Sequence, residues 1–535
     1  MSDFFFRTED IGPANILDYF VETDEDRSAV EQLKGRNPTV LIGSRGVGKS
    51  FLMRVAEQEL VNGFQTHKVV PVYVTFVSGS LLRSGDPQQF RHWMLARICR
   101  AILRKVQKMG LLALPPQSAN VLAGLPQDHS NTDGLESIIK AYEASWKQPE
   151  QKVDFSRIPE VEDLKEALED LCEELGISRF CLLMDEAAHI FLPSQQRQFF
   201  SLFRDMRSHC ITCNAAVYPG VTSFGDVFQP THDATMLSIN RDVGASEYIS
   251  SMRKIVEKQA EAGMLKSISK NGQNFSTLAY AATGNPRILL KTISQAPRMS
   301  SSEVNAVIRQ FFRSDIWSEH SALSEKYVGH KEIVDWGRNF VEDTVLPELK
   351  QKNDLYIEKE KSSTSYIWIH RDAPEIIKAS LRILCYTGVL SEHSEGIRAT
   401  RSEVGKRYLV NLGCLFSLEA NPSSTAFSIA KSLTPKRMSE YGARHSAFSP
   451  LVSSGVDITS IEEGFDLEEQ LAKPNTVLDI TPWQRAKLDE LDLKTVGDVL
   501  DATESKLKEA HYVGNVRARR MRDAAIASVL EYLSG

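Results

Sequence analysis

Apolar runs and stretches of helical periodicity alternate along the first three hundred residues of the chain. Runs of strand length, β-branched or wholly apolar as buried parallel strands are, occur at 37–42, 69–77, 180–184, 211–218 and 235–240. Between them lie helical patterns such as "VEDLKEALEDLCEELGIS", where leucines share one stripe and Gly176 marks the end. This alternation predicts an α/β fold with a doubly wound parallel sheet.

The first predicted strand runs into a glycine-rich turn, "LIGSRGVGKS", which fits the pattern G-x-x-x-x-G-K-[ST]. Glycines let backbone N–H groups curl around phosphate oxygens, Lys49 reaches the β- and γ-phosphates, and the Ser50 hydroxyl coordinates Mg²⁺. The segment "KSFLMRVAEQELV" then predicts the helix that such a P-loop requires. The predicted nucleotide-binding residues are Gly43, Ser44, Arg45, Gly46, Val47, Gly48, Lys49, Ser50 and Phe51.

A P-loop needs a second strand that carries carboxylates, and "RFCLLMDEAAHI" provides one. Its apolar run is typical of a fully buried strand and ends in Asp185 and Glu186. Asp185 is suited to hold Mg²⁺ together with Ser50, and Glu186 to polarise the attacking water as a general base. The pair predicts ATP hydrolysis, with Lys49 and Glu186 as catalytic residues.

Composition limits the classes of partner and compartment. The 535 residues carry a net charge of −7, so any nucleic-acid contact must come from local basic patches. Seven scattered cysteines fit a reducing cytoplasm, and the spacing of Cys210 and Cys213 lacks the second pair that zinc needs, which favours a buried strand there. No apolar run is long enough to predict a membrane span.

A third motif, "AATGNPRILLKTIS", lies beyond the predicted sheet. With the P-loop and the Asp-Glu strand, it resembles the AAA+ and STAND superfamilies of P-loop ATPases, most closely their origin-recognition and archaeal-initiator branch. The resemblance implies ATP and Mg²⁺ as cofactors, slow regulated hydrolysis, a helical lid, ATP-driven homo-oligomerisation and a sensor role for Arg287 at the γ-phosphate. The alternative for Arg287 is a solvent-exposed arginine at a helix start.

Two family features have several candidates in this sequence. An arginine finger, which completes the neighbour's site in such rings, could be Arg204, Arg207 or Arg241. The sensor at the end of the fourth strand could be Tyr218 or Thr222.

From residue 373 the pattern predicts a helix to Gly388 and then strand, Glu-Gly turn and strand, with cations at Arg398, Arg401, Lys406 and Arg407. A helix followed by a basic hairpin resembles a winged helix, whose wing could touch a phosphate backbone or, alternatively, a protein. Residues 416–475 are rich in Ser, Pro and Ala and predict a linker.

The last segment resembles a helix-hairpin-helix unit. "HYVGNVRA" places Gly514 and Ala518 at the second-glycine and alanine positions, whereas Tyr512 replaces the first glycine. In such hairpins backbone N–H groups hold a DNA phosphate without reading bases. The predicted DNA-binding residues are Gly514, Arg517, Arg519 and Arg520; a protein-docking domain is the alternative.

The helix predicted over residues 88–110 is amphipathic with a basic polar side, which is either a nucleic-acid contact or a solvated face. Overall, the sequence predicts an ATPase domain, a helical lid, a winged-helix-like domain, a linker and a helix-hairpin-helix-like domain over residues 1–245, 246–320, 321–415, 416–475 and 476–535. The favoured function is a cytoplasmic ATP-dependent switch that binds DNA and assembles or loads partners. The alternative is a STAND-type signalling ATPase, for example in antiphage defence, whose C-terminal domains recognise protein.

Overall fold

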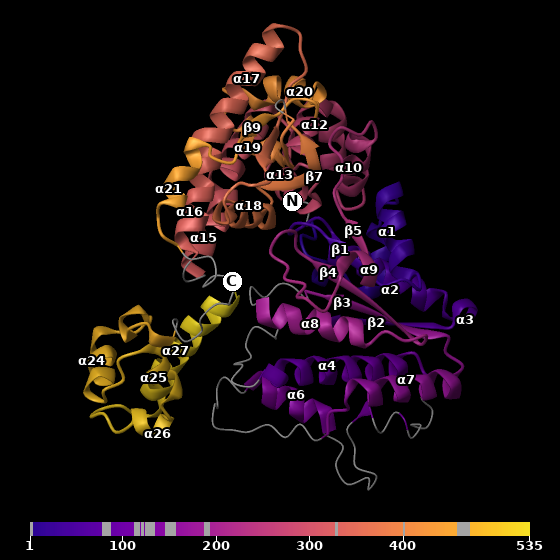
Figure 1. The fold of residues 1–535 in the computed structure, drawn as a ribbon, viewed down its shortest axis with the longest axis vertical. Helices are drawn as coiled ribbons and strands as arrows, with labels where there is room; N and C mark the ends of the chain where they lie inside the picture. Colours follow the sequence, from indigo (N-terminus) through magenta and orange to yellow (C-terminus); the bar gives the residue numbers. More distant parts are fainter. Residues whose placement is uncertain are drawn as a thin grey trace.

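The fold consists of a parallel sheet between helical layers, a helical region joined to a second sheet, and a small helical domain at the C-terminus (Figure 1). This computed structural model describes residues 4–76, 87–111, 118, 122–123, 134–144, 157–186, 193–326, 330–399, 402–456 and 471–534. Among these residues, no helix combines the length and apolarity needed to cross a bilayer.

The first sheet has the predicted strands in the order β2-β3-β4-β1-β5, and every neighbouring pair is parallel. The strands are β1 Thr39–Ile42, β2 Val69–Thr75, β3 Arg179–Asp185, β4 Ile211–Val217 and β5 Thr235–Ser238. The P-loop strand β1 is thus separated from the acidic strand β3 by β4. The predicted parallel P-loop sheet is confirmed, with strand ends that differ from the prediction by at most a few residues.

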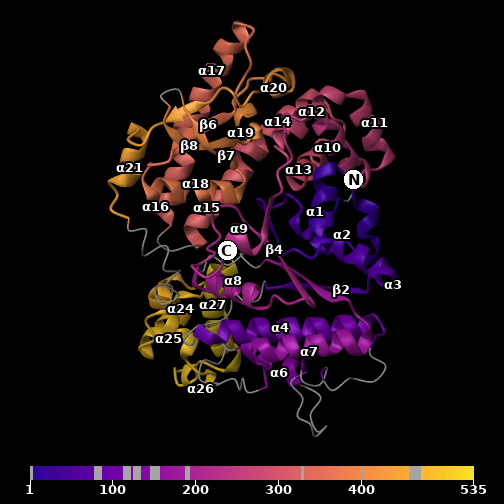
Figure 2. The same ribbon diagram turned by 45° about the vertical axis from the view of Figure 1, so that its right-hand side comes forward.

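Side chains that alternate along each strand feed two cores, one on each face of the sheet. On β3, Phe180, Leu182 and Met184 join the core that includes α4 and α7, whereas Cys181 and Leu183 join the core that includes α1 and α2. Figure 2 shows α4 and α7 below the sheet and α1 and α2 above it. The helices of these layers are α1 Asp24–Lys34, α2 Lys49–Asn62, α3 Phe64–His67, α4 Pro87–Lys108, α6 Gly134–Ala144, α7 Val161–Leu175, α8 Pro193–Asp205 and α9 Pro230–Asp233.

The cysteine pair that a zinc site would use is buried. Cys213 lies on β4 and is fully buried, and Cys210 directly before it is 4% exposed. No cluster of three or more His, Cys, Asp or Glu side chains suited to a metal occurs in the described part of the chain. The prediction of a buried strand at this position is confirmed.

The lid and the second sheet share one hydrophobic core, which includes side chains from Tyr248 to Leu451. The lid helices are α10 Tyr248–Glu257, α11 Ala262–Lys270, α12 Gly272–Ala281, α13 Pro286–Ser294, α14 Ser301–Gln310 and α15 Ile316–Lys326. The predicted boundary between residues 320 and 321 therefore falls inside α15 and does not separate two cores. Apolar side chains continue across it, such as Trp317 and Leu323, and these hold the two regions together.

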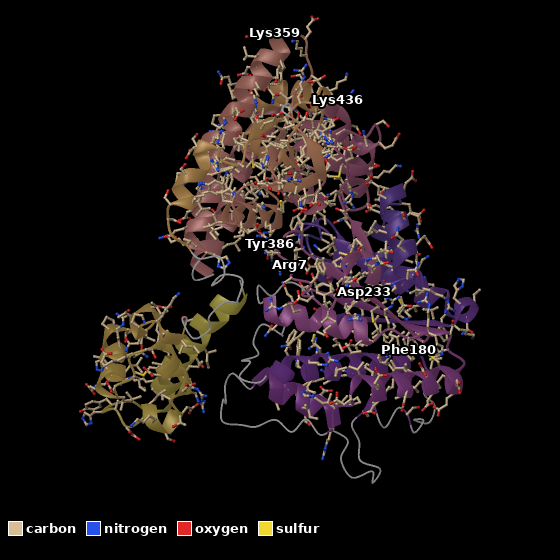
Figure 3. The ribbon with its side chains drawn as sticks, viewed as in Figure 1. Arg7, Phe180, Asp233, Lys359, Tyr386 and Lys436 are labelled. Atoms are coloured by element: carbon tan, nitrogen blue, oxygen red, sulfur yellow. The ribbon has the colours of Figure 1, made fainter. Side chains whose placement is uncertain are left out.

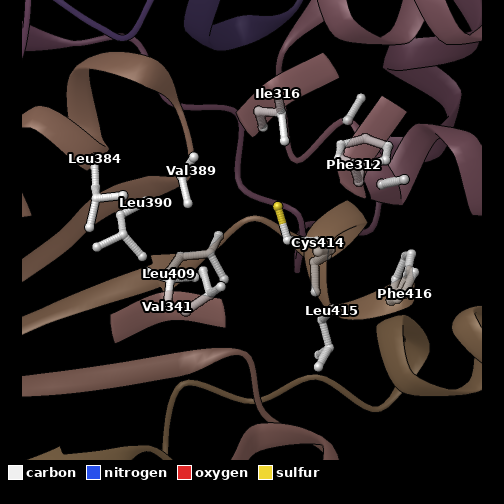
Figure 4. Packing of buried hydrophobic residues seen from close by; sticks show 14 of the residues in the cluster. Phe312, Ile316, Val341, Leu384, Val389, Leu390, Leu409, Cys414, Leu415 and Phe416 are labelled. Atoms are coloured by element: carbon white, nitrogen blue, oxygen red, sulfur yellow. The ribbon is translucent and has the colours of Figure 1, made fainter. Parts of the chain in front are cut away.

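The second sheet has the order β7-β8-β6-β9. Its strands are β6 Tyr366–His370, β7 Leu390–Arg398, β8 Val404–Val410 and β9 Ser439–Tyr441, and α16 Lys331–Asn339, α17 Leu346–Glu358 and α18 Glu375–Thr387 accompany them. Figure 4 shows Leu384 of α18, Leu390 of β7 and Leu409 of β8 in the shared core.

The hairpin expected after residue 390 forms, but its predicted Glu-Gly turn is wrong. Gly396, with φ +67°, lies inside β7, where the register with β8 shifts. Of the predicted wing cations, Lys406 pairs with Glu392 and Glu395 at 2.8 and 2.6 Å. Arg401 lies outside the described residues. The winged-helix assignment stays a prediction.

The prediction of a linker over residues 416–475 is wrong for the part up to residue 456. This segment forms α20 Pro422–Lys431, strand β9 and α21 Ser449–Val452, after α19 Leu412–Phe416. Ala426, Ile429, Tyr441 and Phe448 are buried in the shared core. Sparse apolar side chains among many serines are thus enough to anchor the segment, which composition alone did not indicate. Residues 457–470 lie outside the described residues.

The C-terminal domain has its own small core, formed by residues such as Leu488, Val499, Leu500, Ala518 and Met521. Its helices are α24 Pro482–Glu490, α25 Val496–Asp501, α26 Glu504–Leu507 and α27 Asn515–Ser534. The small all-α domain predicted from the sequence is present, to one side of the first sheet and its helices (Figure 1).

Candidate functional site

The predicted P-loop lines a cavity of about 440 Å³ between the first sheet, the lid and the N-terminal segment. Lys49, Ser50, Glu186, Tyr218 and Arg287 all contribute to its walls. Figure 3 labels Arg7, another lining residue, in the region where the first sheet meets the lid and second sheet. Residues from distant parts of the sequence therefore converge where a nucleotide is expected.

The P-loop glycines have the backbone that the motif requires. Gly46 and Gly48 have φ +89° and +107°, which side chains other than glycine rarely adopt. A Cβ atom on Gly46 would also lie 2.8 Å from Asn285 Oδ1 and 2.9 Å from Arg287 Cβ. Position 46 therefore needs glycine for two reasons: the backbone has a positive φ, and the lid residues Asn285 and Arg287 leave no room for a side chain.

Lys49 is buried and points back at its own loop. Its ammonium donates to the carbonyl oxygens of Gly43 at 2.6 Å and Ser44 at 3.2 Å, and lies 4.0 Å from the ring centre of Tyr218. Burial lowers the pKa of Lys49 to about 7, although the nearby Asp185 carboxylate opposes this shift. A bound triphosphate would supply a negatively charged partner for the buried ammonium and so stabilise its charged form.

Two hydroxyl side chains of β2 hold the carboxylates at the end of β3. The Tyr73 hydroxyl donates to Asp185, and the Thr75 hydroxyl donates to Glu186 Oε2 at 3.3 Å. Burial, reinforced by the Asp185 charge, raises the pKa of Glu186 to about 7. Such a pKa suits a general base at neutral pH.

The sequence did not single out Tyr73 and Thr75, although a signal for them exists. They lie two residues apart in an apolar strand, so they point to the same side of it. The register places Thr75 opposite Asp185 on the neighbouring strand.

The lid is fastened to the P-loop through Asn285 and Arg287. Asn285 Nδ2 donates to the Arg45 carbonyl at 2.8 Å, and its Oδ1 accepts from the Ile288 N–H at 3.2 Å as the N-cap of α13. Arg287 is half-buried, lines the cavity and donates to the Phe6 carbonyl at 2.9 Å. This geometry favours a sensor position for Arg287 over a solvent-exposed one.

We expect Asn285→Ala to weaken nucleotide binding about fivefold, because it removes both the helix cap and the bond to the P-loop, together worth about 1 kcal/mol or more. The matched control is Ser300→Ala, since Ser300 caps α14 in the same lid without touching the P-loop. Both variants should melt at a lower temperature, whereas fluorescent-nucleotide titration should show weaker binding for Asn285→Ala alone. Equal affinities in the two variants would contradict the expectation.

Of the two sensor candidates, Tyr218 lines the nucleotide cavity and Thr222 does not. Thr222 Oγ1 donates to the Tyr218 carbonyl at 2.8 Å and lines a neighbouring cavity instead. Tyr218 directly follows β4, and its ring faces Lys49. The geometry therefore favours Tyr218.

Among the finger candidates, Arg241 is built into its own chain's site. It is 9% exposed, forms two 2.9 Å bonds with Asp26, and donates to the Val47 carbonyl of the P-loop at 2.9 Å. Its guanidinium is thus not available to a neighbouring subunit, and Arg241 as a finger candidate is wrong. Arg204 and Arg207 lie near the surface, where they contact the Val227 carbonyl and Asp233.

The N-terminal segment forms a wall of the cavity that sequence reasoning missed. Phe5 packs edge-on against Tyr19 with ring centres 5.5 Å apart, and Phe20 lies 6.4 Å from Phe51. The Phe5 N–H also donates to Gln259 of the lid region at 2.9 Å. An aromatic wall beside the phosphate loop suits a planar base.

The second-sheet domain also reaches the site. The ring of Tyr386, at the end of α18, lies 5.1 Å from that of Tyr218, edge to face. Arg45 of the P-loop pairs with Glu319 of α15 at 3.3 Å. These contacts join sequence positions more than 160 residues apart, so no local pattern predicts them.

The predicted hairpin surface lies at the start of α27. Tyr512, in place of the first glycine, adopts φ +66°, the left-handed backbone that a glycine would permit. Gly514 and the arginines are exposed; Arg517 lies 4.8 Å from the ring centre of Trp483, and Arg519 pairs with Glu504 at 3.2 Å. The left-handed backbone at position 512 is therefore present without a glycine.

Comparison with known proteins gives one family match. The ORC-CDC6-like family model matches residues 4–71, which include the aromatic N-terminal wall, the P-loop and α2. None of the curated proteins compared with the sequence matches it.

Among solved structures, the chain is similar to the Walker-type ATPase PABY2304 of Pyrococcus abyssi, with 13% identity over 80% of this chain and 97% of that one and a TM-score of 0.37. It is also similar to the Aeropyrum pernix ORC1 protein, solved in complex with DNA, with 13% identity, coverages of 76% and 91% and a TM-score of 0.32. The Aeropyrum pernix ORC2 protein, solved as ADPNP-ADP complexes, gives 10% identity, coverages of 76% and 92% and a TM-score of 0.35.

The strand order, the P-loop and the Asp-Glu pair at the end of β3 are those of a P-loop ATPase. Over residues 4–71, the family match confirms the resemblance to the origin-recognition branch of these ATPases that the sequence motifs indicated.

Proposed function

We propose that this protein is an ATP-dependent switch that binds DNA and changes its assembly with the state of its nucleotide. The observation that carries the proposal is the cavity in which the P-loop, Glu186, the lid arginine and the aromatic N-terminal wall meet. ATP fits there with its phosphates at Gly43–Ser50 and its base toward Phe5 and Tyr19. Ser50 and Asp185 would hold Mg²⁺, which neutralises charge on the phosphates when bound.

Hydrolysis requires Glu186 to accept a proton from a water molecule in line with the γ-phosphate. Thr75 donates to Oε2 of this carboxylate, so release of this bond would leave both oxygens able to orient the water. Lys49 likewise exchanges the Gly43 and Ser44 carbonyls for phosphate oxygens. These two rearrangements make slow, regulated turnover the expected behaviour.

Nucleotide state would act on the other domains through four side chains. Asn285, Arg287 and Glu319 join the lid to the P-loop, and Tyr386 joins the second-sheet domain to Tyr218. A γ-phosphate beside Arg45 and Arg287 would compete for both guanidinium groups. Loss of that phosphate would then change the angle of the lid and second sheet.

DNA binding is assigned to the hairpin domain. Exposed Arg517, Arg519 and Arg520 follow the turn at Tyr512 and Gly514, whose backbone N–H groups would hold a phosphate. The similarity to an ORC1 protein solved with DNA is in keeping with this assignment but does not carry it.

Replacing Arg517, Arg519 and Arg520 together with glutamine should weaken duplex binding at least tenfold at low salt. Removal of three phosphate contacts should also lower the slope of log affinity against log salt by about 2.7. Fluorescence anisotropy of labelled duplex DNA across a salt series measures both effects. An unchanged slope would rule out the hairpin as the DNA contact.

One observation favours the second candidate, a STAND-type signalling ATPase. Trp483, Tyr512 and Val516 of the same domain are 40, 75 and 81% exposed, and such apolar exposure suits a protein partner. A triple variant with unaltered DNA binding, together with loss of assembly on Val516→Asp, would support this candidate instead.

A further inference from the structure

A second basic surface lies at the edge of the first sheet, remote in sequence from the hairpin domain. β2 is the edge strand, and α2 and α4 extend past it on opposite faces of the sheet (Figures 1 and 2). Between them is a groove of about 480 Å³. This groove is here called the edge groove. Its charged lining residues are Arg54 and Glu57 of α2 and Arg97, Arg100, Arg104, Lys105 and Lys108 of α4.

Cations outnumber carboxylates in the edge groove. Glu57 contacts Arg54 at 2.8 Å and Lys105 at 2.6 Å. Glu136 of α6 lies beside it and contacts Arg100, Arg104 and Lys140 at 2.8, 3.2 and 3.3 Å. Two carboxylates thus serve five cations, with Arg97 and Lys108 as further positive charges in the groove, in a chain whose net charge is −7. The excess gives the groove a local positive potential.

The cations are arranged in a row. Arg97, Arg100, Arg104 and Lys108 are separated by three or four residues, so they follow one side of α4 over about 16 Å. Arg104 has 62% of its side chain exposed, and Lys108 is also exposed. A row of four cations, of which Arg104 and Lys108 are exposed, fits a ligand with regularly repeated negative charges.

The lining favours phosphate over an acidic peptide. Arg97 donates to the Thr75 carbonyl at 2.8 Å, which occupies an edge group that an added peptide strand would use. Among the described residues, the aliphatic side chains that line the groove are the small Val72, Val74 and Ala101, which offer no deep pocket for peptide side chains. Four of the cations are arginines, whose planar fork matches phosphate oxygens.

We propose that the edge groove binds the phosphate backbone of a nucleic-acid strand. This site is separate from the hairpin surface and does not depend on the function proposed for it. The groove also borders the ATPase site, since the Arg54 guanidinium lies 3.3 Å from the ring centre of Tyr73, which donates to Asp185. A nucleic-acid strand in the groove would therefore contact Arg54, and Arg54 packs on the tyrosine that is hydrogen-bonded to Asp185.

The test uses the full chain with Arg517, Arg519 and Arg520 already changed to glutamine, so that the hairpin contributes little. In this background, Arg104→Gln with Lys108→Gln removes the two most exposed charges of the groove. The control is Lys266→Gln with Lys270→Gln, which removes two exposed cations of the same spacing from α11. The probe is a labelled oligothymidylate of about 20 nucleotides, titrated by anisotropy across a salt series.

The groove variant should bind the oligonucleotide about tenfold more weakly at low salt, with a salt slope lower by about 1.4, and the control should match its parent. Equal melting temperatures would show that both variants are folded. No binding in the parent, equal slopes in variant and control, or equal competition by polyglutamate would each overturn the proposal. A failure of the hairpin assignment is distinguishable, because the wild type and the triple-arginine variant would then bind DNA equally well.

Discussion

Lys49→Ala should lower the affinity for ATP by about a thousandfold, an effect of roughly 4 kcal/mol. Lys49 is the buried cation of the P-loop, and no other ammonium lines the cavity in the described residues. Alanine would leave the phosphates without this partner and would open a void beside the Tyr218 ring. Calorimetric titration with ATP·Mg²⁺ measures the loss.

Lys68→Ala is a suitable control, because Lys68 is a lysine of the same domain that lies outside the cavity. It should bind ATP as the wild type does. Full ATP affinity in Lys49→Ala would refute the assignment of the nucleotide site.

Glu186→Gln should slow hydrolysis by a factor of about 10² to 10⁴ while ATP affinity stays within a few-fold of the wild type. The amide keeps the shape of the side chain and can still accept from Thr75, but it cannot take a proton from water. A single-turnover assay with radiolabelled ATP separates the chemical step from binding.

The same variant tests assembly, because it should hold ATP long enough for the complex to be sized. Light scattering should show a larger species with ATP than with ADP if nucleotide drives oligomerisation. Glu173→Gln, on the exposed side of α7, is the matched control and should hydrolyse ATP normally. Normal turnover in Glu186→Gln would exclude this residue as the base.

The parallel sheet and the core of the site could be predicted because their signals are local. The P-loop, the Asp-Glu pair and the Asn285-Pro286-Arg287 turn each occupy a few consecutive residues, and flanking apolar runs give their strand or helix context. The structure places Lys49, Glu186 and Arg287 around one cavity, as the motifs implied.

The residues that sequence reasoning missed act through long-range contacts. Tyr73 and Asp185 are 112 positions apart, and Asp26 and Arg241 are 215 apart. Tyr73 and Asp26 are unremarkable in their own segments, and only the folded chain brings them next to Asp185 and Arg241. Long-range contacts also explain the error at Arg241. Its position after the fifth strand made it a candidate arginine finger, but its ion pair with Asp26 fixes it inside its own site.

The linker prediction failed for a different physical reason. Residues 422–431 contain serines and a proline, which usually accompany loops, but Pro422 lies at the start of α20, where a proline is tolerated. Ala426, Ile429 and Ala430 follow at helical spacing and face the shared core. Composition averaged over the segment obscured this short apolar stripe.

The single hydrophobic core of the lid and second sheet has a mechanical consequence. A close-packed interior resists shear, so these helices and strands should pivot as one rigid body on the connection after β5. A rotation of this rigid body that opens the nucleotide cavity would then separate Arg45 from Glu319 and Tyr218 from Tyr386 at the same time. Escape of spent nucleotide and displacement of the second sheet would be one event rather than two successive ones.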